Sequence, residues 1–264
     1  MGDEGVRREL WDGKIPVCFK LDEDEVTMSI RGDRVAPQPC YMMIPRVSYL
    51  PLVYEKLDKL YSRAAGRQVE DEVWVSAEAT PLKWHYPVGV LYDLYGRGQN
   101  LPWEITVHFR NFPEDILLHC ESKEAVEAHF KSKLKERVCY QQLLFKYNYD
   151  EFWAVNKKMM LSTRSEHEPF RSIPFCIYQA CCTDGKILFQ RLLPPHRPKA
   201  SPDDQIVENT LEDIIKLYSA SFPLTEEHCV LIHGIELSVR TPIQWLSENL
   251  SYPDSFLHIC VVHK

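Results

Sequence analysis

The sequence lacks the signatures of several large classes of protein. No apolar run approaches the roughly 18 residues that a membrane-spanning helix requires, and the first residues lack the apolar core of a signal peptide. There is no P-loop, no G-x-G-x-x-G and no G-x-S-x-G, which excludes the common nucleotide-binding loops and the serine-hydrolase elbow. The ten histidines show no metal-ligand spacing, and we therefore expect neither a metal nor a cofactor.

Excess positive charge and paired cysteines are missing as well. The 264 residues carry a net charge of -7, which argues against nucleic-acid binding and against a polybasic membrane anchor. The nine cysteines include no C-x-x-C pair, and the neighbours Cys181 and Cys182 have poor geometry for bridging each other. We therefore expect reduced thiols in a cytoplasmic protein.

Two halves of the chain resemble each other. Three pairs of segments match: residues 15–19 with 173–177, 80–84 with 241–245, and 101–108 with 252–259. The first pair is offset by 158 residues (173 − 15) and the second by 161 (241 − 80), and two motifs at nearly one offset are hard to obtain by chance. We infer a duplicated module of about 90–95 residues, a usual domain size, with a helical insert between the copies.

Hydrophobic periodicity and turn residues predict the elements of each copy. In the first copy we expect strands at 15–19, 40–45, 73–75 and 103–109, helices at 50–64 and 87–95, and a turn at 80–84. In the second copy we expect a hairpin of 175–179 with 186–193, a helix at 210–218 capped by Asn209 or Thr210, and a strand at 229–233. This order indicates an α+β fold. A short helix or tail at 4–11 carries Leu10 and Trp11 as docking groups.

A further helix is expected at 122–137, between the two copies. Ser122 suits its N-cap position, because the hydroxyl can accept a hydrogen bond from an otherwise unpaired backbone N–H. Val126, Phe130 and Leu134 recur at every fourth residue and form one apolar stripe. No glycine or proline interrupts the segment.

Three lysines near the end of this helix point in different directions. At about 100° per residue, Lys131, Lys133 and Lys135 lie about 100°, 60° and 140° from Phe130 around the helix axis. Lys135 therefore points furthest from the apolar stripe. Taken alone, this geometry is also that of a solvated lysine near a helix C-terminus, where a cation is favoured.

A cysteine-based transferase is the enzymatic alternative. A reactive cysteine needs an electropositive, partly open setting and a helper base. Cys120 follows His119 directly, and Cys139 follows a helix end rich in lysine and arginine, but neither has a catalytic signature around it. We therefore expect no catalytic residue in this chain.

Aromatic side chains gather in the matched segments around Trp84 and Trp245. Such residues either anchor a protein partner or pack a domain core. Because the motif occurs in both copies, we favour core packing for the two tryptophans. Arg46, His85 and Tyr86 remain candidates for contact with a partner.

Several long segments resemble the autophagy protein 5 family over nearly the whole chain. These segments are W-x-G-K-I-P at 11–16, I-P-R-V-S-Y-L at 44–50, T-P-L-K-W-H-Y-P at 80–87, L-P-W-E-I-T-V-H-F at 101–109, L-H-C at 118–120, F-W-A-V-N at 152–156 and W-L-S-E-N-L-S-Y-P-D at 245–254. The resemblance implies two ubiquitin-like β-grasp domains that flank a helix-rich domain. The expected boundaries are a helix or tail at 1–12, a first ubiquitin-like domain at 13–112, a helix-rich domain at 113–168 and a second ubiquitin-like domain at 169–264.

The resemblance also implies a function. The family's acceptor segment matches E-A-H-F-x-x-x-x-K-E at 127–136, which places an isopeptide bond to the ubiquitin-like autophagy protein 12 on Lys135. The conjugate would bind the coiled-coil autophagy protein 16 and work with the activating and conjugating enzymes of that system. It would then act like a ligase, promoting attachment of the ubiquitin-like protein 8 to phosphatidylethanolamine. The chain would be a non-catalytic cytoplasmic subunit, peripheral at the phagophore (preautophagosomal) membrane.

Two features of the sequence qualify this expectation. The chain ends in C-V-V-H-K without the C-terminal glycine of a transferred modifier, so we expect an acceptor or a scaffold. The stretch from Lys135 to Phe152 is shorter than the family pattern by several helical turns. An unconjugated ubiquitin-like adaptor that binds a helical partner is therefore the second hypothesis.

Overall fold

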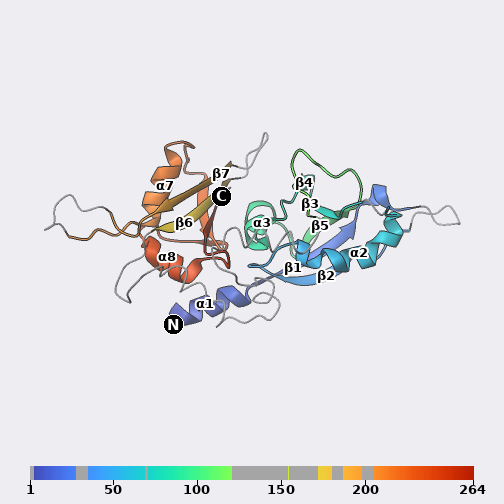
Figure 1. Ribbon diagram of the computed structural model, residues 1–264, viewed down its shortest axis with the longest axis horizontal. Coiled ribbons are helices and arrows are strands. Elements are labelled where there is room, and N and C mark those ends of the chain that lie inside the picture. The colour runs from blue at the N-terminus through green and yellow to red at the C-terminus, as the bar shows by residue number, and fades with distance from the viewer. Residues whose placement is uncertain are drawn as a thin grey trace. The chain divides into compact units, whose positions relative to one another are not determined.

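The computed structural model describes residues 3–27, 35–68, 71–120, 154, 172–179, 187–197 and 205–264 (Figure 1). It divides into two compact units, each of which is described by itself. One unit comprises residues 13–132, and the other comprises 1–12 together with 133–264. The segment expected to be helical at 122–137 lies outside the described residues.

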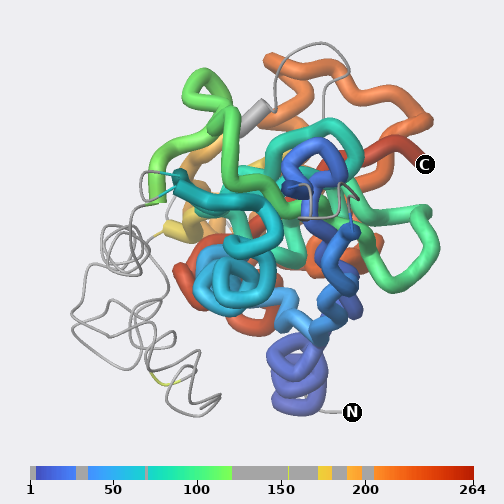
Figure 2. Tube along the Cα trace, turned by 90° about the vertical axis from the view of Figure 1, so that its right-hand side faces the viewer, coloured from blue at the N-terminus to red at the C-terminus, as the bar shows by residue number. Residues whose placement is uncertain are grey.

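The unit of residues 13–132 is built on one mixed five-stranded sheet. Its elements are β1 (Lys14–Leu21), the 3-10 helix η1 (Glu23–Glu25), β2 (Cys40–Pro45), α2 (Pro51–Ala65), β3 (Trp74–Ala77), β4 (Thr80–Pro81), α3 (Val88–Tyr95) and β5 (Trp103–His108). The strand order is β2-β1-β5-β3-β4. β1 pairs antiparallel with β2 and parallel with β5, so the first and last strands lie side by side at the centre. Figure 2 follows the chain by residue number.

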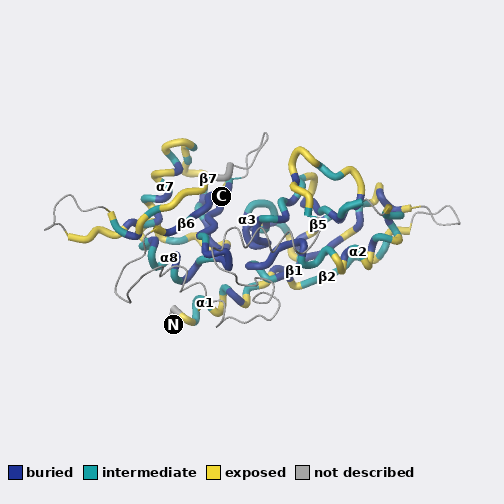
Figure 3. Tube along the Cα trace, in the orientation of Figure 1, coloured by how far each residue is buried: buried dark blue, intermediate teal, exposed yellow. Residues whose placement is uncertain are grey.

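Helix α2 covers one face of this sheet because its apolar side chains recur at every fourth residue. Leu57, Tyr61 and Ala65 are buried, and the Tyr61 hydroxyl donates a hydrogen bond to the carbonyl of Phe19 in β1 at 2.9 Å. The helix ends at Gly66, whose φ of 61° is the left-handed conformation that glycine adopts most easily. In Figure 3 strand β1 is mainly buried, whereas the edge strand β2 and the outer side of α2 are mostly intermediate or exposed.

The second unit repeats the same topology. Its elements are β6 (Ile173–Gln179), β7 (Ile187–Leu193), α7 (Leu211–Ser219), β8 (His228–Ile232), β9 (Ile235–Glu236), α8 (Ile243–Leu250) and β10 (Leu257–His263). The strand order is β7-β6-β10-β8-β9, with β6 and β10 parallel. Of the two N-cap residues expected for α7, the structure selects Thr210, which forms a capping box with Asp213.

The N-terminal helix α1 (Asp3–Asp12) packs on this second unit. Val6 and Leu10 pack against its buried core, and the Arg7 guanidinium donates to Oδ1 of Asn249 in α8 at 3.3 Å. Figure 1 shows α1 beside α8. The helix expected at 4–11 is confirmed, and so is the docking role of Leu10. The Trp11 side chain is buried, with 6% of its surface exposed.

The sheet pairing corrects two of the three matched segment pairs. The match of 15–19 with 173–177 is right, because both form the first strand of a sheet. Thr80 pairs with Ala77, and Ile235 pairs with Ile232, so the counterpart of Thr80 is Ile235 rather than Thr241, at an offset of 155 (235 − 80). The residues after Thr80 therefore match those after Thr241 in sequence but not in structure.

The next helix and the last strand also depart from the matched segments. Pro242 is the N-cap of α8, as Pro87 is of α3, again at an offset of 155 (242 − 87). The last strand is displaced by a different amount: Trp103 pairs beside Val17 and Leu257 beside Phe175, which gives an offset of 154 (257 − 103) where the segment match gives 151 (252 − 101). Both segment matches are therefore wrong in register, although the duplication itself is confirmed.

The expected turn at 80–84 is also corrected. Thr80 and Pro81 form the short edge strand β4. Proline is tolerated there because an edge strand has one side without ladder hydrogen bonds.

Candidate functional site

The lysine expected to accept a modifier, Lys135, lies outside the described residues. The structure does describe the chain that leads to it, from the last strand of the first unit to Cys120. The candidate site is therefore built from residues 108–120 and the side chains that hold them.

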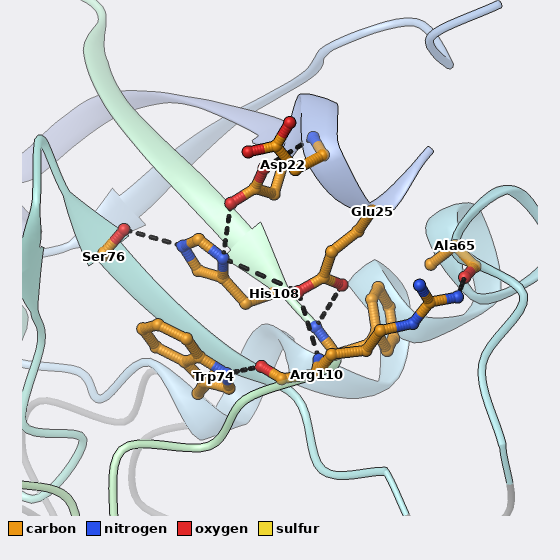
Figure 4. Close-up of polar contacts among 9 residues, drawn as sticks. Asp22, Glu25, Ala65, Trp74, Ser76, His108 and Arg110 are labelled. Carbon is orange, nitrogen blue, oxygen red and sulfur yellow. Dashed lines mark hydrogen bonds and ion pairs between the residues drawn. The ribbon is translucent and has the colours of Figure 1, made fainter. Parts of the chain in front are cut away.

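A polar cluster surrounds the end of β5 (Figure 4). His108 lies between two partners: its Nε2 is 2.8 Å from the Ser76 hydroxyl and its Nδ1 is 2.9 Å from Oδ2 of Asp22. The Trp74 ring stacks on the imidazole with centroids 4.0 Å apart. These partners assign the neutral tautomer in which Nδ1–H donates to Asp22 and Nε2 accepts from Ser76.

Glu25 joins the same cluster from η1. Its carboxylate accepts the backbone N–H of Phe109 at 2.8 Å and of Arg110 at 3.1 Å, which ends the strand. Burial raises the pKa of Glu25, and the two N–H donors oppose that shift. Burial lowers the pKa of His108, against the attraction of Asp22. Both pKa shifts reflect the free-energy cost of a charge in a mostly buried site.

The linked Ser76, His108 and Asp22 have the connectivity of a hydrolase triad, which the sequence did not reveal. Ser76 is only 4% exposed and belongs to β3, and Trp74 stacks on the histidine. A substrate carbonyl could not reach the hydroxyl in this arrangement. We therefore assign the cluster a structural role at the strand end.

The far end of the segment is held by Glu72 and Trp84. The Trp84 indole N–H donates to the carbonyl of Leu118 at 2.7 Å. Oε2 of Glu72 lies 2.7 Å from Nδ1 of His119, and Oε1 accepts the backbone N–H of Cys120. Trp84 is 6% exposed, which confirms core packing as the better interpretation of this tryptophan. Trp245 is partly buried and packs against the hydrophobic core of the second ubiquitin-like unit.

His119, the residue before Cys120, has contacts of its own in this structure. The Nδ1 atom of His119 is committed to Glu72, and its ring stacks on Phe112 with centroids 4.4 Å apart. Cys139, the other candidate nucleophile, lies outside the described residues. Within the described residues, no group of three or more His, Cys, Asp or Glu side chains could hold a metal ion.

The three candidate partner-contact residues lie around α3. Nη2 of Arg46 is 2.5 Å from Oδ1 of Asp93 and 3.3 Å from the carbonyl of Gly89, and its side chain is 15% exposed. His85 and Tyr86 meet edge to face with centroids 4.6 Å apart. Tyr86 is buried and His85 is intermediate. Packing explains Arg46 and Tyr86, and contact with a partner stays a prediction for all three.

Sequence reasoning missed Asp22, Glu25, Glu72 and His108. Each acts through a partner far along the chain: Glu25 reaches Arg110 across 85 residues, and Glu72 reaches Cys120 across 48. No local spacing rule relates such pairs. The one local feature is the run of four carboxylates at 22–25, which contains Asp22 and Glu25.

Two mixed five-stranded sheets of identical order, each with a helix between the second and third strands, define a protein with two ubiquitin-like domains. Two family models agree: "Autophagy protein ATG5, UblA domain" matches residues 10–109, and "Autophagy protein ATG5, UblB domain" matches residues 172–261. The expected α+β fold with two such domains is therefore confirmed.

The chain belongs to the autophagy protein 5 family. It is 38% identical to autophagy protein 5 of Drosophila melanogaster, with 99% of this chain and 98% of that protein covered. It is 37% identical to that of Arabidopsis thaliana, with coverages of 100% and 99%. The fold is similar to the crystal structure of the Kluyveromyces marxianus protein, with a TM-score of 0.76, 18% identity, and 99% and 100% of the two chains covered. The chain accordingly has a role in autophagy.

Proposed function

We propose that this chain is the lysine acceptor and scaffold of a ubiquitin-like conjugation system. In this proposal Lys135 forms an isopeptide bond with the C-terminal glycine of autophagy protein 12. The conjugate binds autophagy protein 16 and promotes transfer of the ubiquitin-like protein 8 to phosphatidylethanolamine. Membership of the family over 99% of the chain, with both ubiquitin-like domains matched, is the observation that carries the proposal.

The chemistry assigned to the chain is aminolysis, with no nucleophile of its own beyond the lysine. The neutral amine of Lys135 attacks the thioester carbonyl of autophagy protein 12 on its conjugating enzyme. The new C–N bond replaces the C–S bond, the thiolate leaves, and the amine loses a proton to water. The chain is therefore a non-catalytic subunit, and its lysine must be exposed and transiently neutral.

The site of action in the proposal is the cytoplasm and the surface of the phagophore membrane. No described helix is long and apolar enough to cross a bilayer. We propose that contact with the membrane is peripheral and comes through the complex with autophagy protein 16. Arg46, His85 and Tyr86 remain proposed contacts for partners, with Arg46 and His85 more accessible than the buried Tyr86.

Intact mass spectrometry tests the acceptor directly. The chain is coexpressed with autophagy protein 12 and its activating and conjugating enzymes, as wild type and as Lys135→Arg. Lys131→Arg and Lys133→Arg are matched controls from the same segment. We expect a mass increase of one modifier in the wild type and both controls, and none in Lys135→Arg. An adduct that persists in Lys135→Arg would move the acceptor elsewhere.

The unconjugated adaptor is the second candidate, favoured by the short segment after Lys135. It predicts a wild-type chain that carries no adduct yet still copurifies with autophagy protein 16. The same coexpression therefore separates the two functions, because only the first changes the mass of the chain.

A further inference from the structure

The N-terminal helix α1 docks on the second ubiquitin-like domain through one face. Val6 and Leu10 are one helical turn apart, and both pack against the buried core of that domain. Between them, the Arg7 guanidinium donates its hydrogen bond to Asn249 of α8 at 3.3 Å. Along the chain, Leu10 is the last of these three anchors.

The first ubiquitin-like domain begins only three residues after Leu10. Helix α1 ends at Asp12, and β1, which lies inside the first sheet, begins at Lys14. Gly13 is therefore the single residue between the helix and the strand. Its carbonyl accepts the N–H of Arg46 at 2.9 Å, so Gly13 is already anchored in the first domain. Each of these contacts lies within one compact unit, and the chain joins the two units.

Covalent geometry limits the separation of the two anchors. Three residues of extended chain span about 11 Å at most, which is the upper limit for the Cα atoms of Leu10 and Gly13. This limit holds for every relative placement of the two domains. Glycine adopts a wider range of backbone angles than any other residue, so Gly13 is the natural hinge of this short connection.

The sequence of α1 makes its helical state dependent on docking. Ten residues are too few for a stable isolated helix. Gly5 lies inside the helix and disfavours it. Glu9 and Asp12 lie near its C-terminal end, where the helix dipole disfavours negative charge, and the last turn contains no basic residue. The segment therefore has two states, docked as a helix or released and unfolded.

We propose that α1 is a releasable strap that restricts the motion of the two ubiquitin-like domains relative to each other, with Gly13 as its hinge. While α1 is docked, the short connection from Leu10 to Gly13 holds one point of each domain close to the other. When α1 leaves the core, only the connection through residues 121–171 remains. By linkage, a ligand that binds the released segment also frees the domains.

Pulsed EPR distance distributions test the strap on the full-length chain. The nine native cysteines exclude thiol labelling, so the spin labels are attached to a ketone-bearing amino acid. This amino acid replaces Lys56 in α2 and Lys216 in α7, both of which are exposed. The width of the distribution reports how freely the two domains move.

Two variants release the restraint in different ways. An eight-residue Gly-Ser insertion between Asp12 and Gly13 lengthens the connection and keeps every docked side chain. Leu10→Asp undocks α1, because an unpaired charge is costly in an apolar core.

Two matched controls leave the strap intact. The first carries the same insertion between Asn100 and Leu101, in the exposed loop between α3 and β5. The second is Glu9→Ala, on the exposed side of α1. Both controls should keep the width of the wild-type distribution.

The two test variants should both broaden the distribution. Eight flexible residues have an r.m.s. span of about 15 Å, so the insertion should add a spread of that order. The α1 amides should stay protected from exchange in the insertion variant. Leu10→Asp should broaden the distribution as well and should lose this protection.

A wild-type width in the insertion variant would overturn the strap, because the connection through residues 121–171 would then restrict the domains by itself. A wild-type distribution as broad as that of the insertion variant would overturn it too. If Leu10→Asp unfolds the second domain, the insertion variant decides the question. No outcome depends on a modified lysine, so this inference and the proposed function can fail separately.

Discussion

The guanidinium of Arg7 donates a hydrogen bond to Oδ1 of Asn249, which lies 242 residues further along the chain. This contact ties the first helix of the protein to the last helix of its second ubiquitin-like domain. Val6 and Leu10 extend the contact into the apolar core of that domain. The second ubiquitin-like domain is therefore completed by a helix that lies before the first ubiquitin-like domain in the sequence.

Leu10→Ala should destabilise the second domain. The side chain is partly buried against the core, so we expect a loss of about 1–2 kcal/mol, below the roughly 2–5 kcal/mol of a fully buried leucine. Denaturant unfolding gives the loss, and faster amide exchange in α8 and β6 locates it. Glu9→Ala on the exposed side of the same helix is the control and should change little. Unchanged exchange in α8 would contradict the docking role.

Arg46→Ala should cost more than an ordinary surface substitution. It leaves the carboxylate of Asp93, 2% exposed, without the guanidinium that lies 2.5 Å away. Removal of one partner from a buried ion pair costs about 3–5 kcal/mol. The double variant Arg46→Met with Asp93→Leu should recover a large part of that loss in chemical unfolding. Equal stability of Arg46→Ala and wild type would contradict this structural role of Arg46.

The stability of the first domain should depend on pH through His108. Its folded-state pKa lies below the ordinary 6.5, so folding favours the neutral ring. That contribution is fully present above pH 6.5 and is lost as pH falls toward the lowered pKa, with a limiting slope of about 1.4 kcal/mol per pH unit. His108→Gln should remove this slope from unfolding curves measured between pH 7 and pH 5.

Glu25 should act in the opposite sense. Its folded-state pKa is raised above 4.5, so its favourable contribution is present below pH 4.5 and is lost as pH rises through the raised value. Glu25→Gln should therefore steepen the loss of stability on acidification, because the compensating proton uptake is gone. The same titration of the unfolding free energy checks this. A flatter curve in Glu25→Gln would contradict the assigned direction.

Asp254→Ala should strongly destabilise the second domain. Both oxygens of Asp254 lie within about 3 Å of Nε2 of His258, whose Nδ1 is 2.7 Å from the Tyr178 hydroxyl. All three side chains are buried, and the substitution would leave the ring N–H without its carboxylate acceptor. We expect a loss of about 3 kcal/mol or more. Asp254→Asn keeps an acceptor oxygen and should lose less than half as much.

Local patterns predicted well those elements whose signals are local. The stripe of Leu57 and Tyr61 predicted α2, and the polar residues before α7 predicted a cap that proved to be Thr210. Neighbouring turns of a helix and its cap are close in sequence, so spacing carries the information. The segment matches at 241–245 and 252–259 were wrong because the register of a strand in a sheet is not set by its neighbours in the sequence. Strand register depends on partners across the sheet, such as Thr80 with Ala77 and Ile235 with Ile232.

The sequence by itself determined the duplicated α+β architecture and the membership of the family, and it predicts the lysine that accepts the modifier, because each rests on contiguous motifs. Only the tertiary structure decided which copy the N-terminal helix completes and which side chains hold the chain before that lysine. Glu72 and Cys120, or Arg7 and Asn249, become neighbours only after the sheets close. Hydrogen bonds are short-range and directional, so a carboxylate's partner depends on the folded path of the chain and not on its place in the sequence.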